Sequence, residues 1–260
     1  MMRWICLLGL CFYSTISLAN KIRILSVDEP PANYLNEKNE PEGYAVDIIN
    51  ALKKEVGSTT EIEFTPEARA INLIRTQPNI LLFSISRTPF REKDYRWIGP
   101  VFTKKWEVYT LKTSNFKVND VEDLKTLPVI GLVRGDVREE WLINKKLTNL
   151  HSVTHHQQNF QRLLMGRVSA IVYEKSGLTQ LMNEMEIDSS MIESIFTINE
   201  APVYIAVSKK TSLKTFKTWQ RAFEKIKKNG KLKQISTLWQ TKLMDDFNIE
   251  SKISNQLLTF

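Results

Sequence analysis

Cysteine is almost absent from this chain of 260 residues, and its placement is informative. The two cysteines, Cys6 and Cys11, both lie in an apolar stretch at the N-terminus, so the remainder of the chain can form no disulfide bond. There are only 9 glycines, and neither a phosphate-binding glycine loop, a nucleophile elbow nor a zinc-spaced cysteine set occurs. We therefore expect no cofactor, no catalytic residue and no metal ligand.

Long hydrophobic runs are also missing beyond the N-terminus, where no segment approaches the roughly 20 apolar residues that a membrane span needs. At the N-terminus, Arg3 precedes an apolar stretch over residues 4–13, and residues 17–19 carry small side chains at the two positions that signal peptidase inspects. The stretch is too short for a membrane anchor, and the residue before Cys11 is too large for a lipoprotein site. The sequence predicts a secretory signal peptide over residues 1–19.

Acidic residues are in the minority, with 29 Asp and Glu against 36 Lys and Arg, which gives a net charge of +7. Loss of Arg3 with the signal peptide lowers this charge to +6, since no acid lies before residue 20. A basic chain raises nucleic acid as a partner, but export argues against it. The lysines are scattered or set on helix faces, as over residues 225–233, which is typical of a solvated surface. We expect a monomer that binds no nucleic acid.

One stretch brings hydroxyl groups and a guanidinium together. The apolar run over residues 80–83 predicts a buried strand, and Ser84 and Ser86 follow at alternate positions, which a strand directs to one face. Thr88-Pro89 is typical of a helix start, and Arg91 follows it. Hydroxyls, free backbone N–H groups and an arginine suit a carboxylate. In isolation, the same string would equally fit a solvated turn.

The stretch resembles the carboxylate-binding segment of the bacterial extracellular solute-binding proteins of family 3, the periplasmic polar amino acid-binding proteins of ABC transporters. In that family, a strand ends in a small or hydroxyl residue, followed by Ser or Thr and, five positions on, by an arginine. Ser84, Ser86 and Arg91 stand at these positions, and residues 97–100 are similar to one subgroup. The resemblance implies that these three residues bind the carboxylate of a ligand.

The resemblance covers about residues 20–243 and implies an α/β, two-lobed, periplasmic-binding-protein-like fold of type II. Each lobe would be a sheet flanked by helices, and two strands would form the hinge. Extended apolar segments at residues 106–111 and 201–207 are the expected crossings between the lobes. The predicted boundaries are residues 20–108 and 204–260 for lobe 1 and residues 109–203 for lobe 2. The tail over residues 245–260 lies beyond the resemblance, and its pattern assigns it no role.

Hydrophobic periodicity predicts an alternation of strands and helices along the chain. The expected strands cover residues 21–27, 61–65, 80–83, 101–111, 128–133, 168–174 and 201–208. The expected helices cover residues 43–56, a segment after Pro66, and residues 120–127, 160–166, 214–228 and 231–243.

Further candidate ligand-binding residues lie in the first lobe. Glu29 and Tyr34 are on the proline-rich loop after the first strand, where the family supplies an acid and an aromatic ring and where ligands bind in open α/β sheets. A solvated loop acid is the alternative for Glu29. After Pro66 the subgroup has a tryptophan and then an arginine; Arg69 matches and Glu67 does not. A carboxylate at this position favours a cationic ligand group, or it is simply a first-turn helix acid.

In the second lobe, the resemblance assigns Arg134, Asp136 and Val137 to a turn and helix start that close over the ligand. Glu174, at the end of a predicted strand, matches the position where the family places an aspartate against the ligand's ammonium; such a pairing lowers the pKa of the acid. The only histidines in the chain are His151, His155 and His156. Without an evident acidic or cysteine partner they indicate a polar strand or loop rather than a metal site.

The resemblance implies a periplasmic solute-binding protein, and not an enzyme, that captures a small zwitterionic solute such as an amino acid. The lobes would close around the solute, and the permease of an ABC transporter would recognise the closed form. Two alternatives share the fold. One is an exported enzyme similar to cyclohexadienyl dehydratase, in which Glu174, Glu67 or Glu29 would be the general acid or base. The other is a ligand sensor that serves no transporter. The sequence does not identify the solute.

Overall fold

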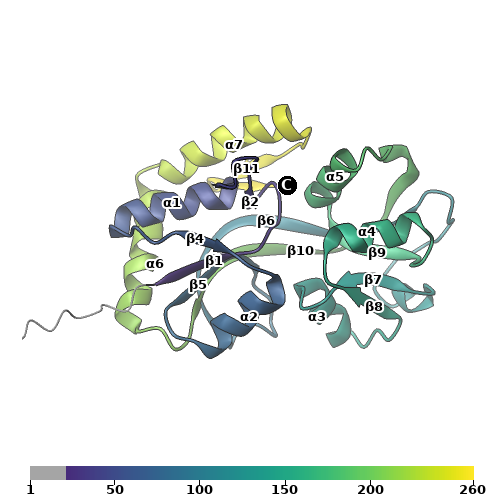
Figure 1. Cartoon of the computed structure of the whole chain (residues 1–260), viewed down its shortest axis with the longest axis horizontal. Helices are drawn as coiled ribbons and strands as arrows, with labels where there is room; N and C mark the ends of the chain where they lie inside the picture. The colour runs from purple at the N-terminus through teal and green to yellow at the C-terminus, as the bar shows by residue number, and fades with distance from the viewer. Residues whose placement is uncertain (1–21) are drawn as a thin grey trace, which may run out of the picture.

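A computed structural model describes residues 22–260. The predicted signal peptide, residues 1–19, lies outside the described residues. The chain forms two α/β lobes joined by a pair of strands (Figure 1), so the predicted two-lobed fold is confirmed. None of the helices in the described part of the chain combines the length and the apolar character that crossing a lipid bilayer requires.

The main sheet has the strand order β4-β1-β5-β10-β6-β9-β7-β8. In the first lobe the parallel strands are β1 (Arg23–Ser26), β4 (Ile62–Phe64) and β5 (Ile80–Ser86). In the second lobe they are β7 (Ile130–Val133), β8 (Leu150–Val153) and β9 (Ala170–Glu174). Ligands bind at the carboxyl ends of the parallel strands in open α/β sheets, so this topology predicts a ligand site between the lobes.

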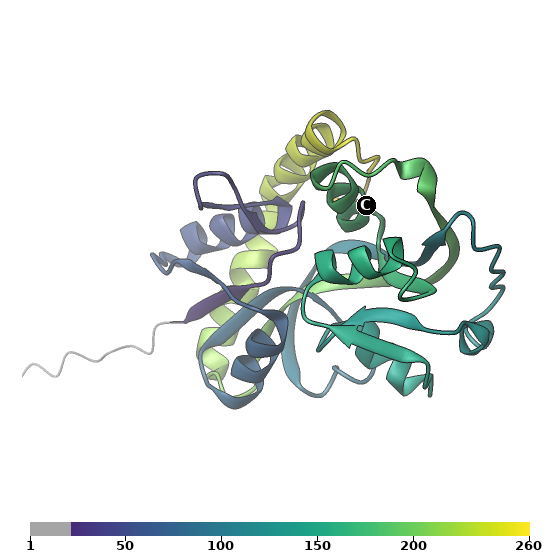
Figure 2. The same cartoon turned by 45° about the vertical axis from the view of Figure 1, so that its right-hand side comes forward.

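Two long antiparallel strands connect the lobes: β6 (Tyr95–Leu111) and β10 (Ile192–Ser208). In both views they are the ribbons that run from one lobe into the other (Figures 1 and 2). Their pairing is continuous except for register shifts, one of which falls between Val203 and Ile205. Bulges of this kind bend a strand locally, which suits a hinge.

Helices cover the sheets. The first lobe carries α1 (Tyr44–Val56), α2 (Glu67–Thr76), α6 (Leu213–Lys228) and α7 (Lys231–Phe247). The second lobe carries α3 (Val137–Asn144), α4 (His156–Leu164) and α5 (Lys175–Glu184). Helix α1 buries an apolar stripe that includes Ile48 and Leu52, and it ends at Gly57, whose φ of 66° is left-handed. Short 3₁₀ turns occupy Asp123–Thr126 and Ser189–Met191.

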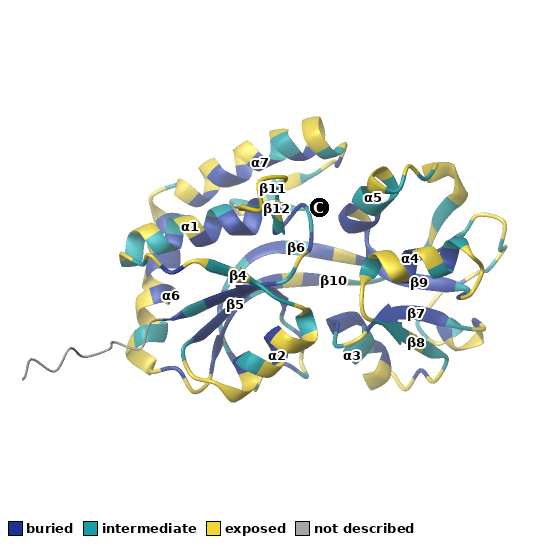
Figure 3. Cartoon of the chain, in the orientation of Figure 1, coloured by how far each residue is buried: buried dark blue, intermediate teal, exposed yellow. Residues whose placement is uncertain are grey.

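The buried apolar residues form separate cores in the two lobes (Figure 3). Along β6 the core membership changes between Phe102 and Trp106, and along β10 it changes between Ala201 and Val203. Each lobe therefore has its own hydrophobic support. The boundaries after residues 108 and 203 stay predictions.

Some local expectations are wrong. No helix begins at Thr88-Pro89: residues 89–94 form turns, in which Arg91 N–H donates to the Thr88 carbonyl at 3.0 Å. The helix signal fails because β6 already begins at Tyr95 and leaves no room for a helix. The helix expected over residues 120–127 is the single 3₁₀ turn over Asp123–Thr126.

Two small β-elements complete the first lobe. A short hairpin of β2 (Tyr34–Leu35) and β3 (Pro41–Glu42) follows the proline-rich loop. The C-terminal hairpin consists of β11 (Lys252–Ser254) and β12 (Leu257–Thr259). Strand β12 pairs in parallel with Phe102 and Thr103 of β6, and the Phe260 ring stacks on that of Phe102 with centroids 5.3 Å apart. The tail thus adds two strands, β11 and β12, to the main sheet.

Candidate functional site

Two adjoining cavities lie between the lobes. The inner cavity has a volume of about 20 Å³ and is lined by residues of both lobes, among them Arg91 and Asp136. The outer cavity has a volume of about 500 Å³. Val27, Glu29 and Glu67 line both of them, so the two cavities form one candidate site.

Arg91 is fully buried and lines the inner cavity. Its Nε donates to Glu140 Oε2 on α3 at 2.7 Å, while Nη1 and Nη2 are buried without a hydrogen-bond partner among the described residues. A buried donor without a partner costs about 1–3 kcal/mol, so such groups require an explanation. Two adjacent nitrogens of a planar guanidinium match the two oxygens of a carboxylate.

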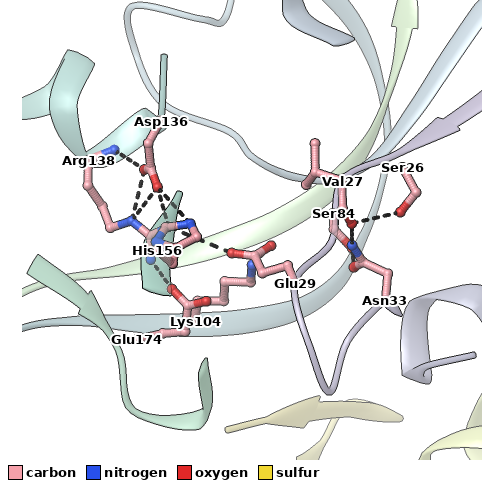
Figure 4. A network of polar contacts seen from close by, with 10 residues as sticks. All are labelled: Ser26, Val27, Glu29, Asn33, Ser84, Lys104, Asp136, Arg138, His156 and Glu174. Carbon is pink, nitrogen blue, oxygen red and sulfur yellow. Dashed lines mark hydrogen bonds and ion pairs between the residues drawn. The ribbon is translucent and has the colours of Figure 1, made fainter. Parts of the chain in front are cut away.

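The two serines that precede Arg91 also line the inner cavity. Ser84 has a left-handed backbone, with φ of 62°, and its hydroxyl donates to Asn33 Oδ1. The Asn33 amide in turn donates to the Val27 carbonyl at 2.5 Å (Figure 4). This network holds the end of β5 in an uncommon conformation beside the cavity, as is typical of ligand sites.

Across the inner cavity, Arg138 on α3 is 3% exposed. Its Nε donates to both oxygens of Asp136, at 2.8 and 3.0 Å, and its Nη1 donates to Glu174 Oε2 (Figure 4). The guanidinium carbon lies 4.8 Å from the centre of the Tyr173 ring. Asp136 also caps α3 by accepting from the Arg138 backbone N–H at 2.7 Å. One cation of the protein therefore joins two carboxylates and an aromatic face.

These contacts set the protonation of the second-lobe residues. Burial alone would raise the pKa of Asp136, but the charge and hydrogen bonds of Arg138 outweigh it and lower that pKa to about 2. Burial likewise opposes ionisation of Glu174, yet Arg138 and Lys104 lower its pKa. Both acids are therefore ionised and paired at neutral pH.

His156 belongs to the same group of residues. We call this group, which consists of Asp136, Arg138, His156, Tyr173 and Glu174, the second-lobe wall. Its ring stacks on Tyr173 with centroids 4.2 Å apart, and its Nε2 lies 3.7 Å from Asp136 Oδ2. Burial and the neighbouring Arg138 charge lower its pKa to about 4. His156 is therefore neutral at pH 7 and adds no positive charge to the site.

The first-lobe acids behave differently. Glu29 pairs with Lys104, which is buried on β6, yet burial raises the pKa of Glu29 to about 8. Glu67 has no ion-pair partner within residues 22–260, and burial together with the charges of Asp136 and Glu29 raises its pKa well above the usual range. Burial therefore opposes ionisation of both carboxyl groups, and a cation brought close to them favours it.

The outer cavity is acidic. Asp28, Glu29, Glu67 and Glu184 line it, together with Tyr173 and other uncharged residues, and no lysine or arginine of the described chain does. Burial and the nearby Glu184 charge raise the pKa of Asp28. A volume of about 500 Å³ lies within the range of small-molecule sites.

The structure brings most of the predicted site residues together. Those that line the inner cavity are Glu29, Glu67, Ser84, Ser86, Arg91, Asp136 and Val137. Glu174 lies beside it, on Arg138. Three others line neither cavity: Tyr34 packs edge-on against Phe247 with ring centroids 6.1 Å apart, and Arg69 and Arg134 are exposed.

Sequence reasoning missed several charged or titratable residues of the site: Lys104 and Arg138 at the inner cavity, and Asp28, His155, His156, Tyr173 and Glu184 at the outer one. Arg138 carried a usable signal, since a cation in the first turn of a helix opposes the helix dipole and needs a nearby acid. Lys104 lies in a strand with no pattern that distinguishes it from other lysines. His156 was one of three histidines, and only the fold shows that it faces the cavity.

The model of the bacterial extracellular solute-binding proteins, family 3, matches residues 22–242. The arginine-binding periplasmic protein of Mannheimia haemolytica is 25% identical over 226 residues, which are 85% of this chain and 91% of that protein. A histidine kinase sensor domain with similarity to periplasmic binding proteins superimposes with a TM-score of 0.74 at 16% identity, over 84% of this chain and 95% of that one. A mutant of ArgBP from T. maritima superimposes with a TM-score of 0.72 at 17% identity, over 85% of this chain and 95% of that one. The two structural likenesses show a shared fold.

Proposed function

This chain belongs to family 3 of the bacterial extracellular solute-binding proteins, and on that basis we propose that it captures a small amino-acid-like solute between its lobes in the periplasm. The predicted signal peptide supports export. The relative from Mannheimia haemolytica is a binding protein, and on that basis we propose binding without catalysis.

Arg91 carries the proposal. Arg91 lines the inner cavity beside Ser84 and Ser86, its Nη1 and Nη2 are buried without a partner among the described residues, and a carboxylate of the solute would satisfy both of them. The small volume, about 20 Å³, suits a carboxylate group rather than a whole solute. The remainder of the solute then extends into the outer cavity.

The outer cavity favours a cationic group on that remainder. Glu67 lies where the two cavities meet, and its desolvated carboxyl gains a partner when a positive group arrives. The arginine-binding function of the relative from Mannheimia haemolytica agrees with a basic solute. We take arginine as the first probe and expect basic solutes to be preferred over acidic ones.

Capture would proceed by closure of the lobes about β6 and β10, which shields the solute from water. We propose that residues 20–108 and 204–260 move as one body against residues 109–203. The closed monomer would then be recognised by the permease of an ABC transporter. A second function, as a sensor, shares the same cleft and is favoured by the likeness to the histidine kinase sensor domain.

A thermal-shift screen of residues 20–260 against amino acids, polyamines and small carboxylates tests the proposal. A true solute at one hundred times its dissociation constant adds about 2.7 kcal/mol of stability. Calorimetry with the strongest hit then compares the wild type with Arg91→Lys, which retains the charge but loses the planar fork. We expect binding at least tenfold weaker, about 1.4 kcal/mol.

Arg87→Lys is the matched control, because Arg87 lies four residues earlier, just before the turns, lines neither cavity and pairs with the exposed Glu92. Its dissociation constant should equal that of the wild type. An unchanged dissociation constant for Arg91→Lys and for Arg91→Ala would refute the carboxylate assignment.

A further inference from the structure

The second-lobe wall already contains a cation in contact with its acids. Arg138 donates to Asp136 through Nε and Nη2 and to Glu174 through Nη1, and its Nη2 also lies 3.8 Å from Glu29 Oε1. The guanidinium is buried and lies against Tyr173. The acids Asp136 and Glu174 thereby already share one cation that the protein itself supplies.

Three cations of the protein lie around the position beside the solute's carboxylate. Arg91, Lys104 and Arg138 all line the inner cavity. Three acids line it as well: Asp136 is paired with Arg138, Glu29 is paired with Lys104, and Glu67, where the inner cavity meets the outer one, has no ion pair among the described residues. An ammonium on the carbon next to the carboxylate would have to displace Arg138 from Asp136 and Glu174 or lie close to it, and like charges at contact distance repel.

The size of the inner cavity also argues against an ammonium beside the carboxylate. The inner cavity has about 20 Å³, which is about the space of one water-sized group and is already required by the carboxylate. The free volume lies elsewhere, in the outer cavity of about 500 Å³, where Asp28 and Glu184 add to Glu67 at the junction of the two cavities.

We propose that Arg138 takes the position of a ligand ammonium, so that the site selects carboxylates whose positive charge lies at the far end of the molecule and needs no amino group beside the carboxylate. The solute class is that of ω-amino and ω-guanidino carboxylates. The proposal rests on the proposed function, since it assumes that Arg91 holds the carboxylate. Arg138 is then a specificity-determining residue.

Three probes that differ by one group test this on the wild-type mature protein. L-Arginine carries a carboxylate, an amino group next to it and a guanidinium at the far end. The compound 5-guanidinopentanoate lacks the amino group, and agmatine lacks the carboxylate. Calorimetric titration should give 5-guanidinopentanoate a dissociation constant equal to or lower than that of arginine. A value more than threefold higher than that of arginine overturns the proposal.

Agmatine separates this failure from failure of the proposed function. We expect agmatine to bind at least tenfold more weakly than 5-guanidinopentanoate, because it offers Arg91 no carboxylate. If agmatine binds within threefold of arginine, or if none of the three probes binds, the carboxylate assignment itself fails and the present proposal fails with it.

Variants at Arg138 provide a reciprocal test. Arg138→Gln removes the internal cation and leaves Asp136 and Glu174 free for a ligand ammonium, so arginine should now bind more tightly than 5-guanidinopentanoate. Arg138→Lys retains a cation and should keep the wild-type order of the two probes. A wild-type order in a folded Arg138→Gln protein contradicts the proposal. Where that variant does not fold, the three probes on the wild type decide.

Discussion

The two walls of the cleft are built from similar groups but in different states. The second-lobe wall is largely paired within itself: Arg138 joins Asp136 and Glu174 and lies on Tyr173, and Glu174 Oε1 alone of these carboxylate oxygens is buried without a hydrogen-bond partner among the described residues. The first-lobe wall has unmatched groups: two guanidinium nitrogens of Arg91 without a partner among the described residues, and the carboxyl of Glu67 without an ion pair there. The same chemistry thus serves structure on one side and suits recognition on the other.

The difference teaches where to expect stability and where to expect affinity. Removing one member of a buried, satisfied ion network leaves its partner charged and buried, which costs folding energy. Removing a group whose partner is the ligand should change the stability of the ligand-free protein little and should weaken ligand binding strongly. The three predictions below apply this distinction, beginning with the largest effect.

Asp136→Ala should lower the free energy of unfolding by about 3–5 kcal/mol, since it leaves Arg138 without its main counter-ion and removes the cap of α3. Urea denaturation of the ligand-free protein measures this. Asp188→Ala is the control, because Asp188 also caps a short helix but is exposed, and its loss should cost about 1 kcal/mol. Equal effects for the two variants would mean that the second-lobe wall is not a structural network.

His156 should make the protein less stable in mild acid. Its pKa is lowered to about 4 in the folded protein, below its ordinary value of 6.5. Between these values the unfolded chain binds a proton that the folded chain does not, so stability is lost as the pH falls from about 6.5 to 4. The shift corresponds to about 3 kcal/mol at most, at about 1.4 kcal/mol per pKa unit.

The measurement is the free energy of unfolding against pH for the wild type, His156→Gln and His151→Gln. The acid-side decline should be shallower in His156→Gln. His151 is exposed, so His151→Gln should follow the wild type. Parallel curves for all three proteins would show that His156 titrates as a solvated histidine.

Glu67→Gln should have the smallest effect and should change ligand preference rather than folding. We expect it to reduce the preference for arginine and lysine over glutamine and glutamate by about 1–2 kcal/mol, a Coulomb gain reduced by desolvation. Competition binding with these four amino acids provides the ranking. Glu61→Gln, at an exposed site in the same lobe, is the control. An unaltered ranking in Glu67→Gln would make Glu67 a first-turn helix acid with no part in recognition.

Much of the fold is predictable because it depends on local pattern. The stripe of α1 and its stop at Gly57, the buried run of β5 and the paired helices after residue 213 all follow from apolar spacing and helix-end chemistry. The α/β class and the two lobes are confirmed. The Thr88-Pro89 helix signal fails because the available chain length, which no local pattern reports, overrides it.

The candidate site is predictable only where its residues are close in sequence. Ser84, Ser86 and Arg91 lie within one strand end and its turn, and the structure places all three on the inner cavity. The ion pairs Arg138–Glu174 and Lys104–Glu29 join residues from different elements, so they depend on how the lobes pack. Whether these residues bind a ligand stays a prediction.

The C-terminal hairpin adds a kinetic consequence. Strand β12 lies along β6 at Phe102 and Thr103, where one core gives way to the other, and Phe260 stacks there. A hinge strand with a third strand fastened beside it resists bending more than a free pair does. Residues 252–260 line neither cavity, yet they should set how quickly the lobes separate and hence how long a captured solute stays bound. The residues that line the cavities would then set the affinity for the solute, and the C-terminal hairpin would set its residence time.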